Sequence, residues 1–191
     1  RVLAAGKHRD PFKVLGPSAD GTEIVALLPG AHRVWAVNAT DQRELVQRWG
    51  DVPVFVGESL PYYRLRIEWN GGYVEEKEDP YRFTPVLGSL DEHLISEGRH
   101  ESLWRVLGAH PMQHENVPGV HFAVWAPNAS RVSVVGAFNA WNGIAHPMRL
   151  RGSSGIWELF IPGLTEGETY KYEILTAEGE LLPLKADPVG F

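Results

Sequence analysis

Leu28–Val34, with the sequence LPGAHRV, resembles Ala126–Val132, APNASRV, which lies 98 residues further along the chain. Two more pairs of matching segments flank these stretches. A Val-Leu-Gly tripeptide that ends at Gly16 recurs 92 residues later, and the Asp-Pro pair that begins at Asp79 recurs 108 residues later. A spacing that grows along the chain indicates one structural unit present twice, with insertions in the second copy.

Each copy has the pattern of short β-strands separated by turns. Gly and Pro number 20 and 14 among 191 residues, roughly 18% of the chain against about 12% in average proteins. Between the turns, apolar residues alternate, so that Val120, Phe122 and Val124 share one face of an extended segment. The sequence therefore predicts an all-β fold of two tandem immunoglobulin-like antiparallel β-sandwiches joined by a short helical connector.

We divide the chain into residues 1–88, a first β-sandwich and N-terminal accessory module, and residues 89–191, the connector plus a second β-sandwich. Ser89 and Glu92 have the spacing of a capping box at the start of a helix, and Gly98 can end that helix in the left-handed conformation. The connector should pack against a domain because it carries several large apolar residues: Leu90, Leu94, Ile95, Leu103 and Trp104.

The composition argues against several classes of partner. The net charge is −6, whereas a protein that binds nucleic acid would be expected to carry positive charge. No apolar run approaches the ~18 residues of a membrane span, and no signal peptide is visible, so we expect a cytoplasmic protein without a membrane partner. The chain has no cysteine, which excludes disulfides and thiolate chemistry.

Two segments, Phe122–Ala129 (FAVWAPNA) and Val134–Trp141 (VVGAFNAW), resemble the glucan-binding domain found ahead of the catalytic barrel in α-glucan enzymes. A wider set resembles the bacterial 1,4-α-glucan (glycogen) branching enzymes: Asp79–Phe83 (DPYRF), Glu97–His100 (EGRH), Leu107–Pro111 (LGAHP), Gly155–Gly163 (GIWELFIPG) and Leu184–Pro188 (LKADP). The resemblance covers essentially the whole chain. It implies that the chain corresponds to the N-terminal portion of such an enzyme, with two β-sandwich modules of which the second binds α-glucan.

The resemblance also implies an activity for the parent enzyme. Branching enzymes cleave α-1,4-glucan and transfer the piece to form α-1,6 branches, by a retaining mechanism that uses two carboxylates. In the family these carboxylates lie on a catalytic (β/α)₈ barrel, which we expect to follow Phe191. We therefore assign no catalytic residue, metal or cofactor to this chain. Asp79 and Asp187 each precede a proline and are interpreted as turn residues.

Trp141 is the strongest candidate for a glucan-binding residue. It lies in a polar stretch of the second copy, and the corresponding stretch of the first copy has no aromatic residue. A flat indole face can cover the C–H face of a sugar ring while polar neighbours bind its hydroxyls. In the resembled family, the tryptophan of this segment is a glucan platform. The alternative is a Trp141 side chain tucked under its own loop.

Two further residues are candidate sugar contacts. Asn139 can hydrogen-bond sugar hydroxyls, or it can simply shape the turn. Lys171 matches a sugar-contacting lysine of related glucan-binding domains, or it is a solvated lysine on a strand. Many such domains carry a second platform tryptophan near their last hairpin, but residues 177–182 contain no aromatic residue. The expected ligands are glycogen and maltooligosaccharides.

The remaining aromatic and histidine residues have structural interpretations. Four tryptophans fall on predicted strands and should lie in the core or at an interface: Trp35, Trp49, Trp69 and Trp157. Trp125 is more consistent with domain packing than with glucan binding. His110 and His114 have the spacing of a metal pair on a helix, but Pro111 between them argues against a helix, so we predict no metal site.

Two alternative functions stay open. The chain could be a non-catalytic glucan-binding regulatory module, or a β-sandwich interaction module that does not bind sugar. A duplicated sandwich with a connector favours the branching-enzyme interpretation over the regulatory one, since a regulatory subunit would need only one copy.

Overall fold

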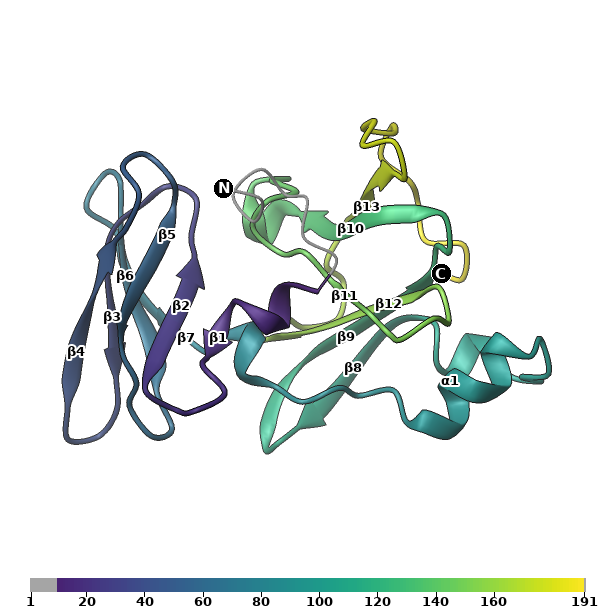
Figure 1. Cartoon of the computed structure of the whole chain (residues 1–191), viewed down its shortest axis with the longest axis horizontal. Helices are drawn as coiled ribbons and strands as arrows, with labels where there is room; N and C mark the ends of the chain where they lie inside the picture. The colour runs from purple at the N-terminus through teal and green to yellow at the C-terminus, as the bar shows by residue number, and fades with distance from the viewer. Residues whose placement is uncertain (1–9, 191) are drawn as a thin grey trace.

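The computed structural model describes residues 10–190, which form two β-structured modules side by side, with the first module on the left of Figure 1 and the second on the right. The first module contains β1 (Gly16–Pro17), β2 (Glu23–Leu27), β3 (Ala31–Val37), β4 (Gln42–Gln47), β5 (Val54–Glu58), β6 (Arg64–Trp69) and β7 (Val74–Lys77). Hydrogen bonds connect these strands in the order β1-β2-β5-β4-β3-β6-β7, all antiparallel where they pair.

Strand β4 joins the two layers of the first module. Its first part pairs with β3, where Leu45 lies opposite Val34, and its end pairs with β5, where Val46 lies opposite Val56. The sheet can therefore fold over along β4 and enclose the apolar faces of both layers. The enclosed core contains Ile24, Ala26, Val34, Ala36, Leu45, Phe55, Leu65 and Ile67.

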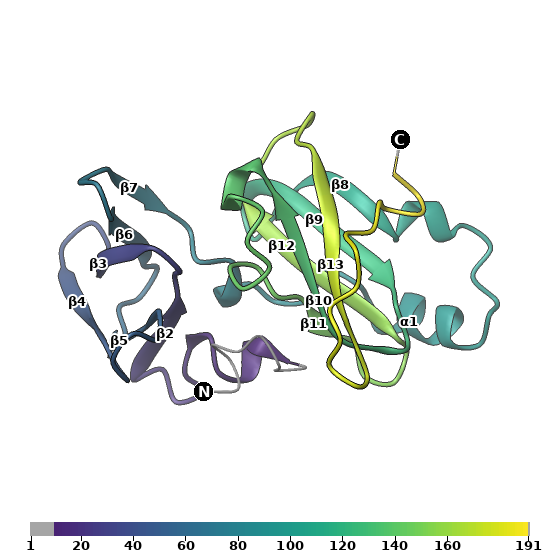
Figure 2. The same ribbon diagram turned by 90° about the horizontal axis from the view of Figure 1, so that it is seen from above.

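The second module has two facing sheets. Its strands are β8 (Gly108–His114), β9 (Val117–Trp125), β10 (Ala129–Gly136), β11 (Arg149–Leu150), β12 (Ile156–Pro162) and β13 (Tyr170–Thr176). The sheet β11-β12-β9-β8 lies against the pair β10-β13, which covers it in the view from above (Figure 2). Val120, Phe122 and Val124 are all buried, as their alternation predicts. The predicted all-β sandwich fold is confirmed.

The two modules share part of one hydrophobic core. Leu27, Val56 and Tyr81 from the first module belong to the same buried cluster as Met148 and Trp157 from the second. Tyr81 lies in the 3₁₀ turn Pro80–Arg82, and its hydroxyl donates a buried hydrogen bond to the Pro147 carbonyl at 3.0 Å. The relative position of the modules is therefore fixed by packing. The division between residues 88 and 89 remains our proposal for the chain organisation.

The connector contains α1 (Ser89–Ser96) and the 3₁₀ turn Leu103–Arg105. The predicted capping box is wrong: Gly88 precedes the helix as its N-cap, so no side chain caps it. Gly98 ends the helix with a φ of 68°, as predicted. Ile95 and Val106 pack against the second module. Leu90 and Trp104, however, are 67% and 57% exposed, so the packing prediction holds for only part of the connector.

A buried carboxylate fastens the connector to the second module. Glu158 on β12 accepts hydrogen bonds from the Leu87 amide at 3.0 Å, from His121 Nε2 at 2.9 Å and from Arg151 Nη1 at 2.8 Å. Arg151 also reaches Glu92 of α1 at 3.1 Å. Burial alone would raise the pKa of Glu158, but these hydrogen bonds and the neighbouring positive charge outweigh it and lower the pKa below 4.5.

Within residues 10–190, no helix could span a bilayer.

Candidate functional site

The turn after β10 presents Trp141 in an unusual backbone conformation. The 3₁₀ turn Ala137–Asn139 is followed by two left-handed residues, Ala140 at φ 52° and Trp141 at φ 58°. A non-glycine residue in this region costs of order 1–3 kcal/mol and persists only where its surroundings fix it. The Trp141 amide donates a hydrogen bond to the Gly136 carbonyl at 2.9 Å, which closes the turn. This strained turn leaves the Trp141 side chain 41% exposed.

Asn139 holds this turn together through its side chain. Its Oδ1 accepts from the Gly136 amide at 3.0 Å, and its Nδ2 donates to the Val134 carbonyl at 2.9 Å and to His146 Nδ1 at 2.8 Å. Both amide hydrogens are thereby used, which leaves only one acceptor lone pair on Oδ1 for a ligand. Asn139 therefore acts on Trp141 by fixing the turn beneath it.

His146 can accept this hydrogen bond because its ring is neutral. Burial lowers its pKa to about 3, and the positive charge of Lys77 from the first module adds to that effect. With Nδ1 accepting from Asn139, the ring proton resides on Nε2. The sequence showed no sign of this role, since nothing in the spacing links Asn139 to His146.

Lys171 lies on the sheet face that carries the Trp141 turn. On β13, Tyr172 is buried in the core, so its neighbours Lys171 and Glu173 point to the outer face. Gly143 lies directly on Glu173, and a β-carbon at Gly143 would collide with that carboxylate. Lys171 is exposed and pairs with Val135 of β10. The structure thus places the Trp141 turn and Lys171 on one face of the β10-β13 sheet.

The other tryptophans have different environments. Trp157 is fully buried, as predicted, but Trp49 is 66% exposed on a turn, so its core assignment is wrong. Trp125 is exposed and donates from Nε1 to the Ser154 carbonyl at 3.2 Å. Trp69 faces a cleft between the modules, a feature that no sequence pattern indicated.

His110 and His114 lie on β8 on either side of Pro111, so the helix that a metal pair requires does not form. Within the described part of the chain, no group of three or more His, Asp or Glu side chains could hold a metal ion. His110 instead contacts the Leu107 carbonyl at 2.8 Å.

Comparison with known families separates the two modules. Residues 1–81 match the N-terminal domain of alpha-1,4-glucan branching enzyme GlgB, and residues 106–190 match carbohydrate-binding module 48, the isoamylase N-terminal domain. The 1,4-alpha-glucan branching enzyme GlgB of Paramagnetospirillum magneticum is 52% identical over 99% of this chain. The chain corresponds to the N-terminal portion of the GlgB branching enzymes.

Other curated relatives agree with this assignment. The GlgB proteins of Pseudomonas fluorescens and Roseobacter denitrificans are 53% and 50% identical over 99% of this chain. The chain spans about a quarter of the length of these relatives, 26% and 27% respectively. The second module of this chain therefore corresponds to the carbohydrate-binding module of that family, and the first module to the GlgB N-terminal domain. The resemblance inferred from the sequence is confirmed.

Proposed function

We propose that this chain binds α-glucan, such as glycogen or maltooligosaccharide, on the outer face of the β10-β13 sheet. The observation that carries the proposal is the exposed Trp141 side chain on a turn whose backbone strain is held by Asn139. A strained turn that exposes an apolar ring does not improve packing. A role of the Trp141 ring as a stacking platform for sugar would explain why the turn is strained.

Each candidate residue then has a distinct role. The Trp141 indole covers the C–H face of a glucose unit. Lys171, on the same sheet face, donates hydrogen bonds to sugar hydroxyls. Asn139 acts as a positioning residue whose remaining contact with ligand is at most one accepted hydrogen bond. The net charge of −6 suits an uncharged polysaccharide better than a polyanion.

For the parent protein we propose the branching reaction of its relatives: cleavage of α-1,4-glucan and transfer of the piece to form an α-1,6 branch. The two carboxylates of this retaining mechanism would lie on a barrel that follows Phe191. The chain would hold the polymer near that barrel, in the cytoplasm where we expect glycogen to be made.

Because we assign no catalytic residue to this chain, incubating it alone with amylose should leave the iodine-stained spectrum of the amylose unchanged.

Glycogen affinity electrophoresis tests the binding proposal. The chain should be retarded in a gel that contains glycogen and not in a gel without it. Binding to glycogen should be stronger than binding to a short oligosaccharide, because a long polymer chain offers many rebinding sites. Unretarded migration would instead favour the sugar-independent interaction module. Retardation that is undiminished in Trp141→Ala and Lys171→Ala would contradict the assignment of this face.

A further inference from the structure

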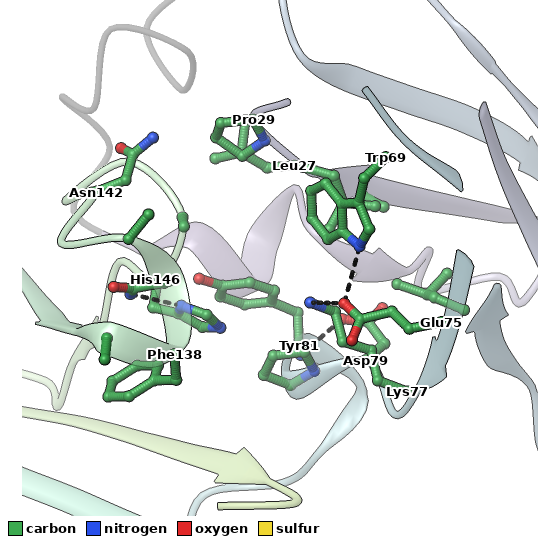
Figure 3. A pocket seen from close by; sticks show the side chains of 18 residues that line it. Leu27, Pro29, Trp69, Glu75, Lys77, Asp79, Tyr81, Phe138, Asn142 and His146 are labelled. Atoms are coloured by element: carbon green, nitrogen blue, oxygen red, sulfur yellow. Dashed lines mark hydrogen bonds and ion pairs between the residues drawn. The ribbon is translucent and has the colours of Figure 1, made fainter. Parts of the chain in front are cut away.

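A cleft of about 380 Å³ lies between the two modules, next to the turn that carries Trp141 (Figure 3). Pro29 and Trp69 line it from the first module, and Phe138 and His146 line it from the second, with Tyr81 between them. This volume is within the range of about 300–1,000 Å³ typical of ligand sites, which also occur preferentially between domains.

The cleft offers a fixed indole. Trp69 is half-buried at the end of β6, and its Nε1 donates to Glu75 Oε1 at 3.0 Å. The Lys77 ammonium lies 5.0 Å from the centre of the ring and pairs with Glu75 at 3.3 Å. These contacts orient the side chain before any ligand arrives, so binding would not have to pay for ordering it.

Hydrogen-bond donors remain available around this indole. His146 Nδ1 accepts from Asn139, which leaves Nε2–H as a donor. Asn142 accepts from the Ile144 amide through Oδ1, and its Nδ2 makes no hydrogen bond with any residue that the structure describes. The Lys77 ammonium has three hydrogens and one carboxylate partner. The cleft therefore combines apolar surface with unused donors.

The charges in the cleft favour an uncharged ligand. Lys77 and Glu75 compensate each other, and the His146 ring is neutral. A buried Asp79 at the base already accepts from the Tyr63 hydroxyl and the Tyr81 amide. An anion would meet no unpaired positive charge among these groups, and both Asp79 oxygens already accept a hydrogen bond. A sugar would find an indole for its C–H face and donors for its hydroxyls.

We infer that this cleft is a second α-glucan subsite, built by both modules around Trp69 and His146. The inference rests on the proposed function for its class of ligand. Ala140 and Asn142, which flank Trp141 in sequence, also line the cleft. One turn thus serves both places: it presents Trp141 outward and forms a wall of the cleft. A glucan held on Trp141 has a second binding place within the same protein.

Nuclear magnetic resonance can separate the two subsites, because each tryptophan indole N–H gives its own signal. We would titrate maltoheptaose into the whole chain and into Trp141→Ala, and record contacts between sugar protons and each indole ring. We expect the Trp69 signal to shift and to show direct sugar contacts in both proteins. The exposed Trp49, in the same module but not in the cleft, is the matched control and should show neither.

A second variant closes the cleft without removing any of its walls. Ala145 lines the cleft, so Ala145→Trp should fill it, and Ala145→Phe is a smaller filler if the first variant folds poorly. Added to Trp141→Ala, either filler should weaken the remaining maltoheptaose binding by at least about tenfold, the loss of roughly one good contact. Alone, it should leave the shift of the Trp141 signal in place.

The outcomes distinguish this inference from the proposed function. If sugar shifts Trp141 but makes no contact with Trp69, glucan binding stands and the second subsite is wrong. If sugar contacts neither ring, both ideas are wrong. If it contacts Trp69 alone, the cleft is confirmed as a subsite and the platform role of Trp141 is wrong.

Discussion

Tyr63 donates its hydroxyl hydrogen to Asp79 across 2.5 Å in the first module, and the duplication repeats the arrangement in the second. There, Tyr170 donates to Asp187 across 2.6 Å. In each module the same aspartate also accepts from the backbone amide two residues later. These carboxylates therefore fix the turn that follows the last strands of a module, which agrees with the prediction that Asp79 and Asp187 are turn residues.

Asp79→Asn should reveal the cost of burying this charge. Burial raises the pKa of the Asp79 carboxyl above 3.8, although hydrogen bonds from Tyr63 and the Tyr81 amide oppose the shift. Protonation is therefore easier in the folded state than in the unfolded one. The stability that this pKa shift contributes is present below 3.8 and is lost as the pH rises through the folded pKa.

The asparagine variant can keep both hydrogen bonds, with Oδ1 accepting from Tyr81 and Nδ2 donating to the Tyr63 oxygen. In urea denaturation at several pH values, the free energy of unfolding of the variant should increase relative to that of the wild type as the pH rises to neutrality. Asp51→Asn, at an exposed turn residue, is the control and should stay within about 0.5 kcal/mol. A pH-independent difference between Asp79→Asn and wild type would contradict this.

Sequence reasoning predicted the parts of the fold that depend on local pattern. The alternation of Val120, Phe122 and Val124 predicted their burial, and the paired Asp-Pro segments predicted matching turns. It failed where tertiary packing decides. Trp49 looked like a strand residue but lies on an exposed turn, and Ser89 had the right spacing for a cap that Gly88 provides instead.

The same limit applies to the candidate site. Trp141 and Lys171 were selected from a resemblance to a family, and the structure places them on one sheet face. The hydrogen bond from Asn139 to His146 spans seven residues of an irregular loop, where no regular periodicity applies, and the cleft at Trp69 joins residues from different modules. No spacing rule within one module can predict a wall that the other module supplies.

Trp141→Ala should weaken glucan binding with little effect on stability. Aromatic stacking of bases on protein rings is worth about 1–3 kcal/mol, and sugar stacking should be of similar size. The melting temperature should barely move, because the ring is partly exposed and removing it creates no core cavity. Thermal denaturation and glycogen affinity electrophoresis on the same protein check both statements. A destabilisation of ~3–5 kcal/mol would show a core role instead.

Trp125→Ala is the matched control for this experiment, since Trp125 is also exposed on the second module. It should leave glycogen retention unchanged. Equal losses in the two variants would mean that retention depends on exposed tryptophan in general and not on the Trp141 turn.

Glu158→Gln should loosen the connector. Removing one partner of a buried ion pair costs about 3–5 kcal/mol, because the remaining charge is left uncompensated. Here Arg151 and His121 lose the carboxylate that they share. In the wild type, the lowered pKa of Glu158 contributes stability above 4.5 that is lost as the pH falls through the folded pKa.

Urea denaturation and amide hydrogen exchange measure this effect. The variant should lose stability at neutral pH, lack that part of the acid dependence, and exchange the amides of Leu87 and α1 faster. Glu101→Gln, at an exposed connector residue, should change neither quantity. Unchanged exchange in α1 would show that the apolar contacts of Ile95 hold the connector without Glu158.

The shared core predicts that the two modules unfold together. Leu27, Val56 and Tyr81 bury apolar surface against Met148 and Trp157, so unfolding one module would expose the core of the other. Calorimetry should therefore show a single transition. Tyr81→Phe removes only the hydroxyl and leaves the buried Pro147 carbonyl without that donor, which should cost ~1–3 kcal/mol. Because that hydrogen bond joins the two modules, the variant should lower the melting temperature of the single transition. Two separate transitions in the wild type, or a shift confined to one of them in the variant, would show that the modules fold independently despite their contact.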